Sequence, residues 1–253
     1  MEKALYHEGH DHTELCYKSF FSRDAETEIV LYPAERLHHL SGLMKGSSLI
    51  DFSTGLGIAH LLAISDSFQE ITLLNANENY VVELEKWRQN HTDSLDFSHW
   101  APTICDLTVN REEPQKLEEK LRKKVNRVLH CDFTKENVTE PHVLPKVDCG
   151  LCIWSLGPIS TDQASYTENM RKMVSLLKVG GHLVVFGGFN ASYFVLGDKK
   201  YHTFMYDENT VRTAMAAAGC SIISFHYDES KTPDHKLDST HMFCAFAIKE
   251  REV

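Results

Sequence analysis

The sequence lacks both a long uncharged apolar run and an apolar segment close to its first residue. No stretch of the 253 residues approaches the roughly 18 to 20 uncharged apolar residues that a membrane-spanning helix needs. The opening residues, MEKALYHEGHDHTEL, contain no apolar core of the kind that a secretion signal requires. We therefore expect a cytosolic (cytoplasmic) protein with no membrane partner.

Positive charge is also scarce. The chain has 26 lysine and arginine residues against 36 aspartate and glutamate residues, which gives a net charge of −10 with neutral histidines. Because such a surface repels polyanions, nucleic acid is not expected as a partner, and a small neutral or cationic ligand suits the chain better. The seven cysteines are an odd number scattered through a long chain, which argues against a disulfide framework and for reduced thiols.

Signatures of hydrolytic, redox and metal sites are missing or incomplete. We find no Ser-His-Asp signature and no P-loop. Cys149 and Cys152 form a C-x-x-C inside a predicted strand, where residues three apart point to opposite faces, whereas redox motifs open a helix; we expect buried thiols. His7, His10 and His12 lie close together without a matched second pair of ligands, so no metal site is expected.

What the chain does contain is a repeated alternation of strand and helix patterns. Four apolar, β-prone runs are each followed by turn residues and a helical pattern, which predicts a parallel sheet covered by helices on both faces. These runs are residues 47–52, 70–75, 126–133 and 147–156. Apolar residues at helical spacing predict amphipathic helices over residues 79–90 and 113–128.

The second half of the chain predicts the other side of the sheet. A helical pattern stops at Gly180 and Gly181 before a fifth strand over residues 183–186, and another helix is expected over residues 208–218. Two final strand patterns, CSIISFHYDES and HMFCAFAIKE, would form an antiparallel hairpin at one edge of the sheet.

Nothing in the sequence divides the chain into parts. We see no internal repeat, linker or low-complexity tract, so we predict one α/β domain over residues 1–253. Residues 1–40 are expected to form an N-terminal helical cover, and the protein is expected to be a monomer.

The first predicted strand leads into a turn with the sequence DFSTGLG. Glycines after a first strand let backbone amides approach a ligand closely, and an acid that ends the next strand can accept hydrogen bonds from ribose hydroxyls. Such a site binds an adenosine-containing cofactor. The turn keeps Asp51, Gly55 and Gly57. Ser53, however, stands where the first glycine would be, and the second strand ends at Asn75. Because tight turns in α/β folds need glycine in any case, a purely structural turn stays open.

From YKSFFSRDAETEI to its end, the sequence resembles the vertebrate small-molecule N-methyltransferases that act on nicotinamide, indolethylamine and phenylethanolamine. The segment LIDFSTGLGIAHLLAISDSFQEITLLNANENYVVELEKW is similar to the family's stretch from the cofactor loop through a Glu-Leu-Glu-Lys-Trp helix. RVLHCDFT, VDCGLCIWSL, SLLKVGGHLVV and SYFVLGDKKY match further family blocks in the same order. The resemblance implies a Rossmann-like methyltransferase fold that holds S-adenosylmethionine at the carboxyl ends of its strands.

The resemblance also implies two groups of site residues. The cofactor side would comprise Tyr17, Asp51, Ser53, Thr54, Gly55, Asn75, Asp132, Phe133 and Ile153. The substrate side would comprise Trp154, Gly187, Tyr193 and Phe194. For Trp154 and Phe194 a packing role is equally open, since aromatic side chains are often buried for area alone. No catalytic residue is assigned, because the cofactor's sulfonium supplies the reactivity and the protein mainly holds the nucleophile in line.

The chain departs from the family pattern on both sides of the site. On the cofactor side, Ser53 replaces a glycine, Ala59 a tyrosine, Asn75 the ribose-binding aspartate, Tyr80 an asparagine, and Ile153 a threonine. On the substrate side, Gly187 takes the place of the nicotinamide enzyme's substrate-binding aspartate. The cofactor site is therefore expected to be weakened, and nicotinamide is not the expected substrate.

Two hypotheses follow. The first is an S-adenosylmethionine-dependent methyltransferase that transfers a methyl group to a nitrogen of a small amine or N-heterocycle. The alternative is a degenerate methyltransferase-fold protein that has lost S-adenosylmethionine binding and serves as a small-molecule-binding protein or a repurposed catalyst.

Overall fold

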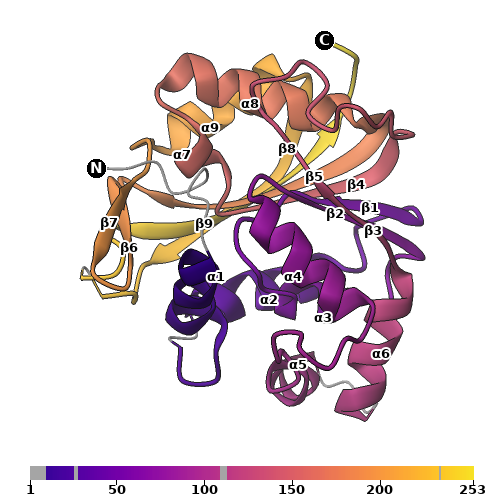
Figure 1. The fold of residues 1–253 in the computed structure, drawn as a ribbon. Coiled ribbons are helices and arrows are strands. Elements are labelled where there is room, and N and C mark those ends of the chain that lie inside the picture. The colour runs from indigo at the N-terminus through magenta and orange to yellow at the C-terminus, as the bar shows by residue number, and fades with distance from the viewer. Residues whose placement is uncertain (1–9, 26–27, 109–112, 234) are drawn as a thin grey trace.

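A mostly parallel, seven-stranded sheet forms the centre of the computed structural model, which describes residues 10–25, 28–108, 113–233 and 235–253 (Figure 1). The strands are β1 Ser48–Asp51, β2 Glu70–Asn75, β3 Val125–His130, β4 Val147–Ile153, β5 Leu177–Phe189, β6 Tyr193–Leu196, β7 Lys199–His202, β8 Cys220–Glu229 and β9 His241–Lys249. The order in the large sheet is β3-β2-β1-β4-β5-β9-β8. Strands β1 to β5 run parallel, and β9 is antiparallel to both β5 and β8.

Helices cover both faces of this sheet. They are α1 His10–Cys16, the π-helix η2 Tyr17–Phe21, α2 Glu28–Leu40, α3 Ala59–Leu62, α4 Glu78–Arg88, α5 Trp100–Thr108, α6 Pro114–Lys124, α7 Leu156–Ile159, α8 Gln163–Ser175 and α9 Glu208–Ala217. Helices α2 to α6 lie on one face, and α7, α8 and α9 on the other (Figure 1). Within the described residues, no helix is long and apolar enough to cross a membrane.

Alternation along the strands divides the apolar residues between two cores. In β1, Leu49 belongs to the core on the α2 to α6 side, whereas its neighbour Ile50 belongs to the core under α8 and α9. Successive side chains of a strand point to opposite faces, so a strand covered on both sides is apolar throughout. This explains why the central strands read as continuous apolar runs.

The chain changes direction across the sheet between β1 and β4. From β1 it winds outward through β2 to β3, and it then returns to place β4 on the other side of β1. Asp51 at the end of β1 is in register with Leu73 of β2 and with Leu151 of β4. In open α/β sheets, the crevice outside the carboxyl ends of the strands at such a switch point is where ligands bind.

The predicted fold class is confirmed, including the antiparallel β8–β9 hairpin. Of the N-terminal cover expected over residues 1–40, the described part is helical at residues 10–21 and at Glu28–Leu40, and residues 1–9 lie outside the described residues.

Several predicted boundaries are wrong. The strands expected over residues 126–133 and 147–156 end at His130 and Ile153. The helix expected over residues 113–128 ends at Lys124, because Val125 and Val128 pair with β2 in strand β3. Strand β5 begins at Leu177, ahead of the two glycines expected to stop a helix, because Leu177 pairs with Val147. The short ribbon of β6 and β7 was not predicted.

Candidate functional site

The loop after β1 is closed by a buried carboxylate. Asp51, with 4% of its surface exposed, accepts hydrogen bonds at Oδ1 from the backbone N–H of Ser53 (3.0 Å) and from the Ser53 hydroxyl. Its Oδ2 lies 2.7 Å from Nε2 of His60. Both carboxylate oxygens therefore have partners within the protein. His60 was missed at the sequence level; its position in the first turn after the loop is the signal that could have found it.

Asn75 at the end of β2 is turned toward the same loop. Its side-chain amide donates to the carbonyl oxygens of Gly55 (3.0 Å) and Ser53 (3.3 Å), and its Oδ1 accepts from the N–H of Asn77 (2.9 Å). The side chain is buried, with 3% of the residue exposed. An aspartate could not make the two bonds to the loop carbonyls, because an ionised carboxylate has no donor. Asparagine at this position thus stabilises the loop itself.

The ring of Phe21 lies directly in front of the loop glycines. A Cβ built on Gly55, whose φ is +92°, would be 2.7 Å from Cε2 and Cζ of Phe21. A Cβ built on Gly57 would be 2.5 Å from Cε1 of the same ring. Both glycines therefore allow close approach, as the sequence predicts, but the group that approaches is a side chain of this chain. Phe21 was not among the predicted site residues.

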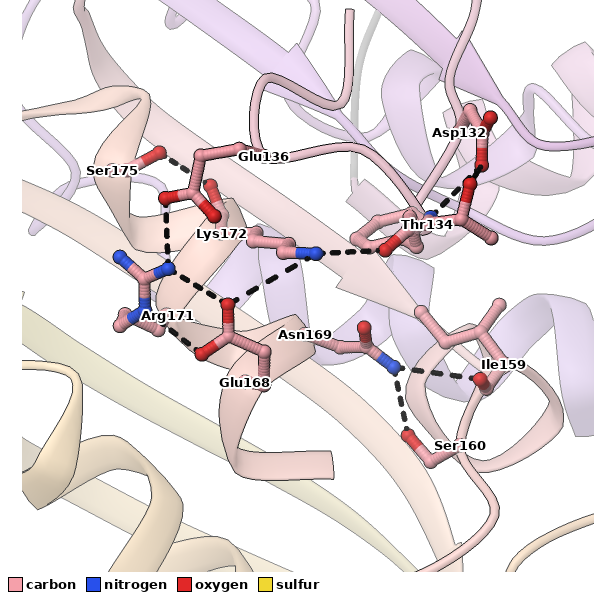
Figure 2. A network of polar contacts seen from close by, with 11 residues as sticks. Asp132, Thr134, Glu136, Ile159, Ser160, Glu168, Asn169, Arg171, Lys172 and Ser175 are labelled. Carbon is pink, nitrogen blue, oxygen red and sulfur yellow. Dashed lines mark hydrogen bonds and ion pairs between the residues drawn. The ribbon is translucent and has the colours of Figure 1, made fainter. Parts of the chain in front are cut away.

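A polar network on α8 supports the loop after β3 (Figure 2). Lys172 donates to the carbonyl oxygen of Phe133 at 2.9 Å, and Arg171 pairs with both Glu168 and Glu136. Within the loop, the Asp132 carboxylate accepts from the N–H of Thr134 (2.8 Å) and from the Thr134 hydroxyl (2.7 Å). These bonds hold the pKa of Asp132 below its ordinary value, so its carboxylate stays ionised.

The same helix also fixes the segment after β4. Asn169 donates to the Ser160 hydroxyl at 3.2 Å and to the Ile159 carbonyl at 3.4 Å, both at the end of α7 (Figure 2). The helix itself begins at a capping box, in which Asp162 and Ser165 exchange hydrogen bonds. Through α8 the loops after β3 and β4 are thus held relative to each other.

An apolar cavity of about 110 Å³ opens at the strand switch point. Its wall includes Thr54 and Gly55 of the loop, Trp154 after β4, Gly187 of β5 and Phe194 of β6. These five predicted site residues come together around one space. Phe20, Phe21, Ile29 and Leu237 add apolar surface.

Apart from His12, the polar side chains on the cavity wall belong to residue types that are uncharged at neutral pH. Cys16 and Tyr80 contribute to the wall, and burial raises the pKa of Cys16 to about 12 and that of Tyr80 well above its ordinary value. The ring of His12 stacks on Tyr80, with 6.0 Å between centroids, and its Nδ1 lies 3.4 Å from the hydroxyl of Tyr201. Among the described residues, no Asp, Glu, Lys or Arg lines the cavity.

Two wall positions show how tightly this end of the sheet is built. Trp154 adopts a left-handed backbone with φ of +60°, and its Nε1 donates to the Ile29 carbonyl at 3.1 Å. Such strained positions persist only where the surroundings hold them, and they are frequent at binding sites. At Gly187, a Cβ would lie 2.1 Å from the hydroxyl oxygen of Tyr206, so that hydroxyl fills the place of a side chain.

Three predicted site residues point elsewhere or lie beneath the wall. The Tyr17 hydroxyl donates to the Asp96 carbonyl at 2.5 Å. Tyr193 lies under the ammonium of Lys200, which is 3.8 Å from its ring centroid. Ile153 is buried in β4, and its carbonyl accepts from the N–H of Thr54 at 2.9 Å.

The C-x-x-C motif lies inside strand β4 and does not open a helix. Cys149 and Cys152 are free, buried thiols of β4, and burial raises the pKa of both. The structure contains no group of three metal-ligating side chains in its described part. His7 lies outside the described residues, as does the side chain of His10.

Comparison with known proteins places the chain. The model of the NNMT/PNMT/TEMT family matches residues 6–250. The chain belongs to this family. Human nicotinamide N-methyltransferase is 33% identical over 241 residues, which are 94% of this chain and 91% of the relative. Mouse indolethylamine N-methyltransferase is 30% identical over 246 residues, which are 91% of this chain and 93% of the relative.

Solved structures show the same fold at low sequence identity. The N-methyltransferase NodS from Bradyrhizobium japonicum WM9, in complex with S-adenosylhomocysteine, has a TM-score of 0.54 and 11% identity. The match covers 94% of this chain and 98% of NodS. This member of the NNMT/PNMT/TEMT family therefore has the fold of S-adenosylmethionine-dependent methyltransferases.

Proposed function

We propose that this family member is an S-adenosylmethionine-dependent methyltransferase that methylates a nitrogen of a small, uncharged amine or N-heterocycle. One observation carries the proposal. A single cavity at the strand switch point has Thr54 and Gly55 of the cofactor loop on one part of its wall and Trp154 and Phe194 on another. A methyl donor at the loop and an acceptor among the aromatic rings would thus share one water-poor space.

Bound S-adenosylmethionine would supply an electrophilic methyl group at this place. Asp132 and Phe133, in the loop that α8 supports, would hold its adenosine end, and Thr54 and Gly55 would border the rest. The cofactor can fit only if the space in front of the loop glycines is free. Because the Phe21 ring fills the space in front of Gly55 and Gly57, a group that binds against these glycines requires Phe21 to move away.

The chain's own residues would select and orient the acceptor. A nitrogen must carry a free lone pair to accept a methyl group, and a protonated amine has none. A buried ammonium without a counter-charge is costly, and no acidic side chain among the described residues lines the cavity. The cavity therefore favours the neutral form of an acceptor, and the apolar rings of its wall would exclude water.

Nicotinamide does not suit the arrangement at β5. The resemblance implies that a relative uses an aspartate at the position of Gly187, and in this chain the Tyr206 hydroxyl stands where that side chain would begin. An acceptor without a carboxamide, such as a plain aromatic N-heterocycle, fits the apolar wall better.

A second candidate is a small-molecule-binding protein that works without the cofactor. The position of Phe21 against both loop glycines favours it, together with the internal partners of Asp51 and Asn75. In this case the cavity would bind a ring compound directly.

Titration calorimetry with S-adenosylmethionine and S-adenosylhomocysteine is the first test, followed by a radiolabelled methyl-transfer assay with quinoline, benzylamine and nicotinamide. Methylation of quinoline in preference to nicotinamide supports methyl transfer. Quinoline binding in the absence of cofactor, with no methyl transfer at any cofactor concentration, supports the second candidate. Asp132→Ala separates them further, because it should abolish methyl transfer but leave cofactor-free binding of quinoline intact. The exposed Asp106→Ala is its matched control.

A further inference from the structure

Phe21 is held in front of the glycine loop by bonds from another part of the chain. Its carbonyl oxygen accepts from Nε1 of Trp100 at 3.0 Å and lies 3.1 Å from Nε2 of His99. Both partners belong to α5 or the residue just before it. Phe21 is buried, with 8% of its surface exposed. The backbone of Phe21 is therefore anchored to residues 99 and 100, and its ring is packed against the loop.

The rest of η2 is anchored to the same region. The Tyr17 hydroxyl donates to the Asp96 carbonyl, and the ring of Tyr17 meets that of Phe97 edge to face, with 5.7 Å between centroids. The π-helix closes on itself through the bond from the N–H of Ser22 to the Tyr17 carbonyl at 2.8 Å. The backbone that carries Phe21 is thus docked against residues 96–100 at both ends of η2.

We propose that Phe21 is an internal plug of the glycine loop and decides whether the cofactor can enter. The ring occupies the close-approach space that Gly55 and Gly57 provide, so a nucleoside cofactor and the Phe21 ring exclude each other. This inference rests on the proposed function, because it concerns access to the same cofactor site.

The burial of the Phe21 ring determines how much the plug should lower cofactor affinity. Moving a buried phenylalanine ring into water is unfavourable. A ligand that must displace the Phe21 ring therefore binds more weakly, by roughly tenfold to hundredfold. A smaller side chain at position 21 should remove most of that factor. Weakening the α5 anchor without touching the loop should remove part of it.

The test is calorimetric titration of the full chain with S-adenosylhomocysteine, comparing the wild type with Phe21→Ala and Phe21→Leu. Phe225→Ala is the matched control, because it removes a partly buried ring packed in the core on the other face of the sheet. Trp100→Phe, which keeps the ring but removes the donor to the Phe21 carbonyl, is the second route. Thermal unfolding of each variant confirms that it is folded.

We expect Phe21→Ala to bind S-adenosylhomocysteine at least tenfold more tightly than the wild type, Trp100→Phe to show a smaller gain, and Phe225→Ala to show none. Equal affinities of wild type and Phe21→Ala would overturn the plug, and so would absence of binding by both folded proteins. The two proposals fail separately. If the wild type transfers methyl groups and binds S-adenosylhomocysteine as tightly as Phe21→Ala does, only the plug is refuted. If Phe21→Ala binds S-adenosylhomocysteine more tightly but no acceptor is methylated, only the methyltransferase is refuted.

Discussion

The side-chain amide of Asn75 donates a hydrogen bond to the carbonyl oxygen of Gly55, 3.0 Å away. This bond joins the end of β2 to the glycine loop after β1, two segments whose shared edge is the expected place of a cofactor. The residue that the resemblance marks as a lost ribose ligand is thus a support of the loop. Replacement of Asn75 should therefore destabilise the glycine loop.

Asn75→Asp should destabilise the protein and should not improve cofactor binding. The carboxylate would face the carbonyl oxygens of Ser53 and Gly55 without a donor, at a cost of about 1–3 kcal/mol for the lost and unsatisfied bonds. Urea unfolding measures the change. Asn209→Asp, on the exposed first turn of α9, is a control that should be neutral or slightly stabilising. Tighter binding of S-adenosylhomocysteine by Asn75→Asp, which the family resemblance by itself would predict, would contradict this interpretation.

Gly187→Ala should destabilise the chain by about 1–3 kcal/mol, the usual cost of overpacking. The new methyl group would lie 2.1 Å from the Tyr206 hydroxyl oxygen and 2.7 Å from Cε1 of Phe243, and both rings are buried. Tyr206→Phe removes the nearer obstructing atom and leaves the Phe243 ring in place, so the double variant should lose less stability than the two single variants added together. A double-mutant cycle by chemical unfolding checks this, and strict additivity would show that the hydroxyl is not the obstacle.

Lys172→Met should loosen the loop that carries Asp132 and Phe133. It removes the donor to the Phe133 carbonyl, a bond worth about 1 kcal/mol, and it should weaken binding of the adenosine end of a cofactor by several-fold. Calorimetry with S-adenosylhomocysteine measures this affinity, with Lys172→Met introduced into the Phe21→Ala variant, which should bind the ligand tightly. Lys199→Met, at an exposed position of β7, should leave both stability and affinity unchanged. Equal behaviour of the two variants would remove Lys172 as a support of the site.

Stability should fall in two steps as the pH is lowered. Burial holds the pKa of His99 and His182 below their ordinary value of 6.5, so the folded state binds fewer protons than the unfolded state. The two histidines contribute fully to stability above pH 6.5, and this contribution is lost as the pH falls through their lower folded-state pKa values. Chemical unfolding at a series of pH values should show this loss, and His182→Phe should reduce it. A flat profile between neutral pH and pH of about 5 would contradict the effect.

The second step belongs to carboxylates. Burial alone would raise the pKa of Asp148, but the Lys178 ammonium and the hydrogen bonds from Ser47 and Ser48 bring it well below 3.8. Asp148 therefore contributes to stability above pH 3.8, and this contribution is lost as the pH falls through its lower folded-state pKa. Lys178→Met should move the second step to higher pH without changing the first.

The order of strands and helices was open to prediction because it depends on local periodicity. Residues 70–75 read as an apolar run and form β2 with those bounds, and the glycine-bearing turn after β1 is where the sequence predicts it. Chain-long resemblance then identified the family. Boundaries failed where one apolar pattern suits two structures, as at Val125 and Val128, which fit a helix face but pair in β3.

By itself, then, the sequence determined the fold class, the family and the loop at which a cofactor is expected. Only the tertiary structure decided what stands at that loop. Phe21 meets Gly55 and Gly57 across more than thirty residues of intervening chain, and His60 meets Asp51 through the turn between β1 and α3. The Phe21 contact depends on how η2 packs against α5 and on the side-chain directions that follow. No periodic pattern encodes it, because it arises from packing between distant segments.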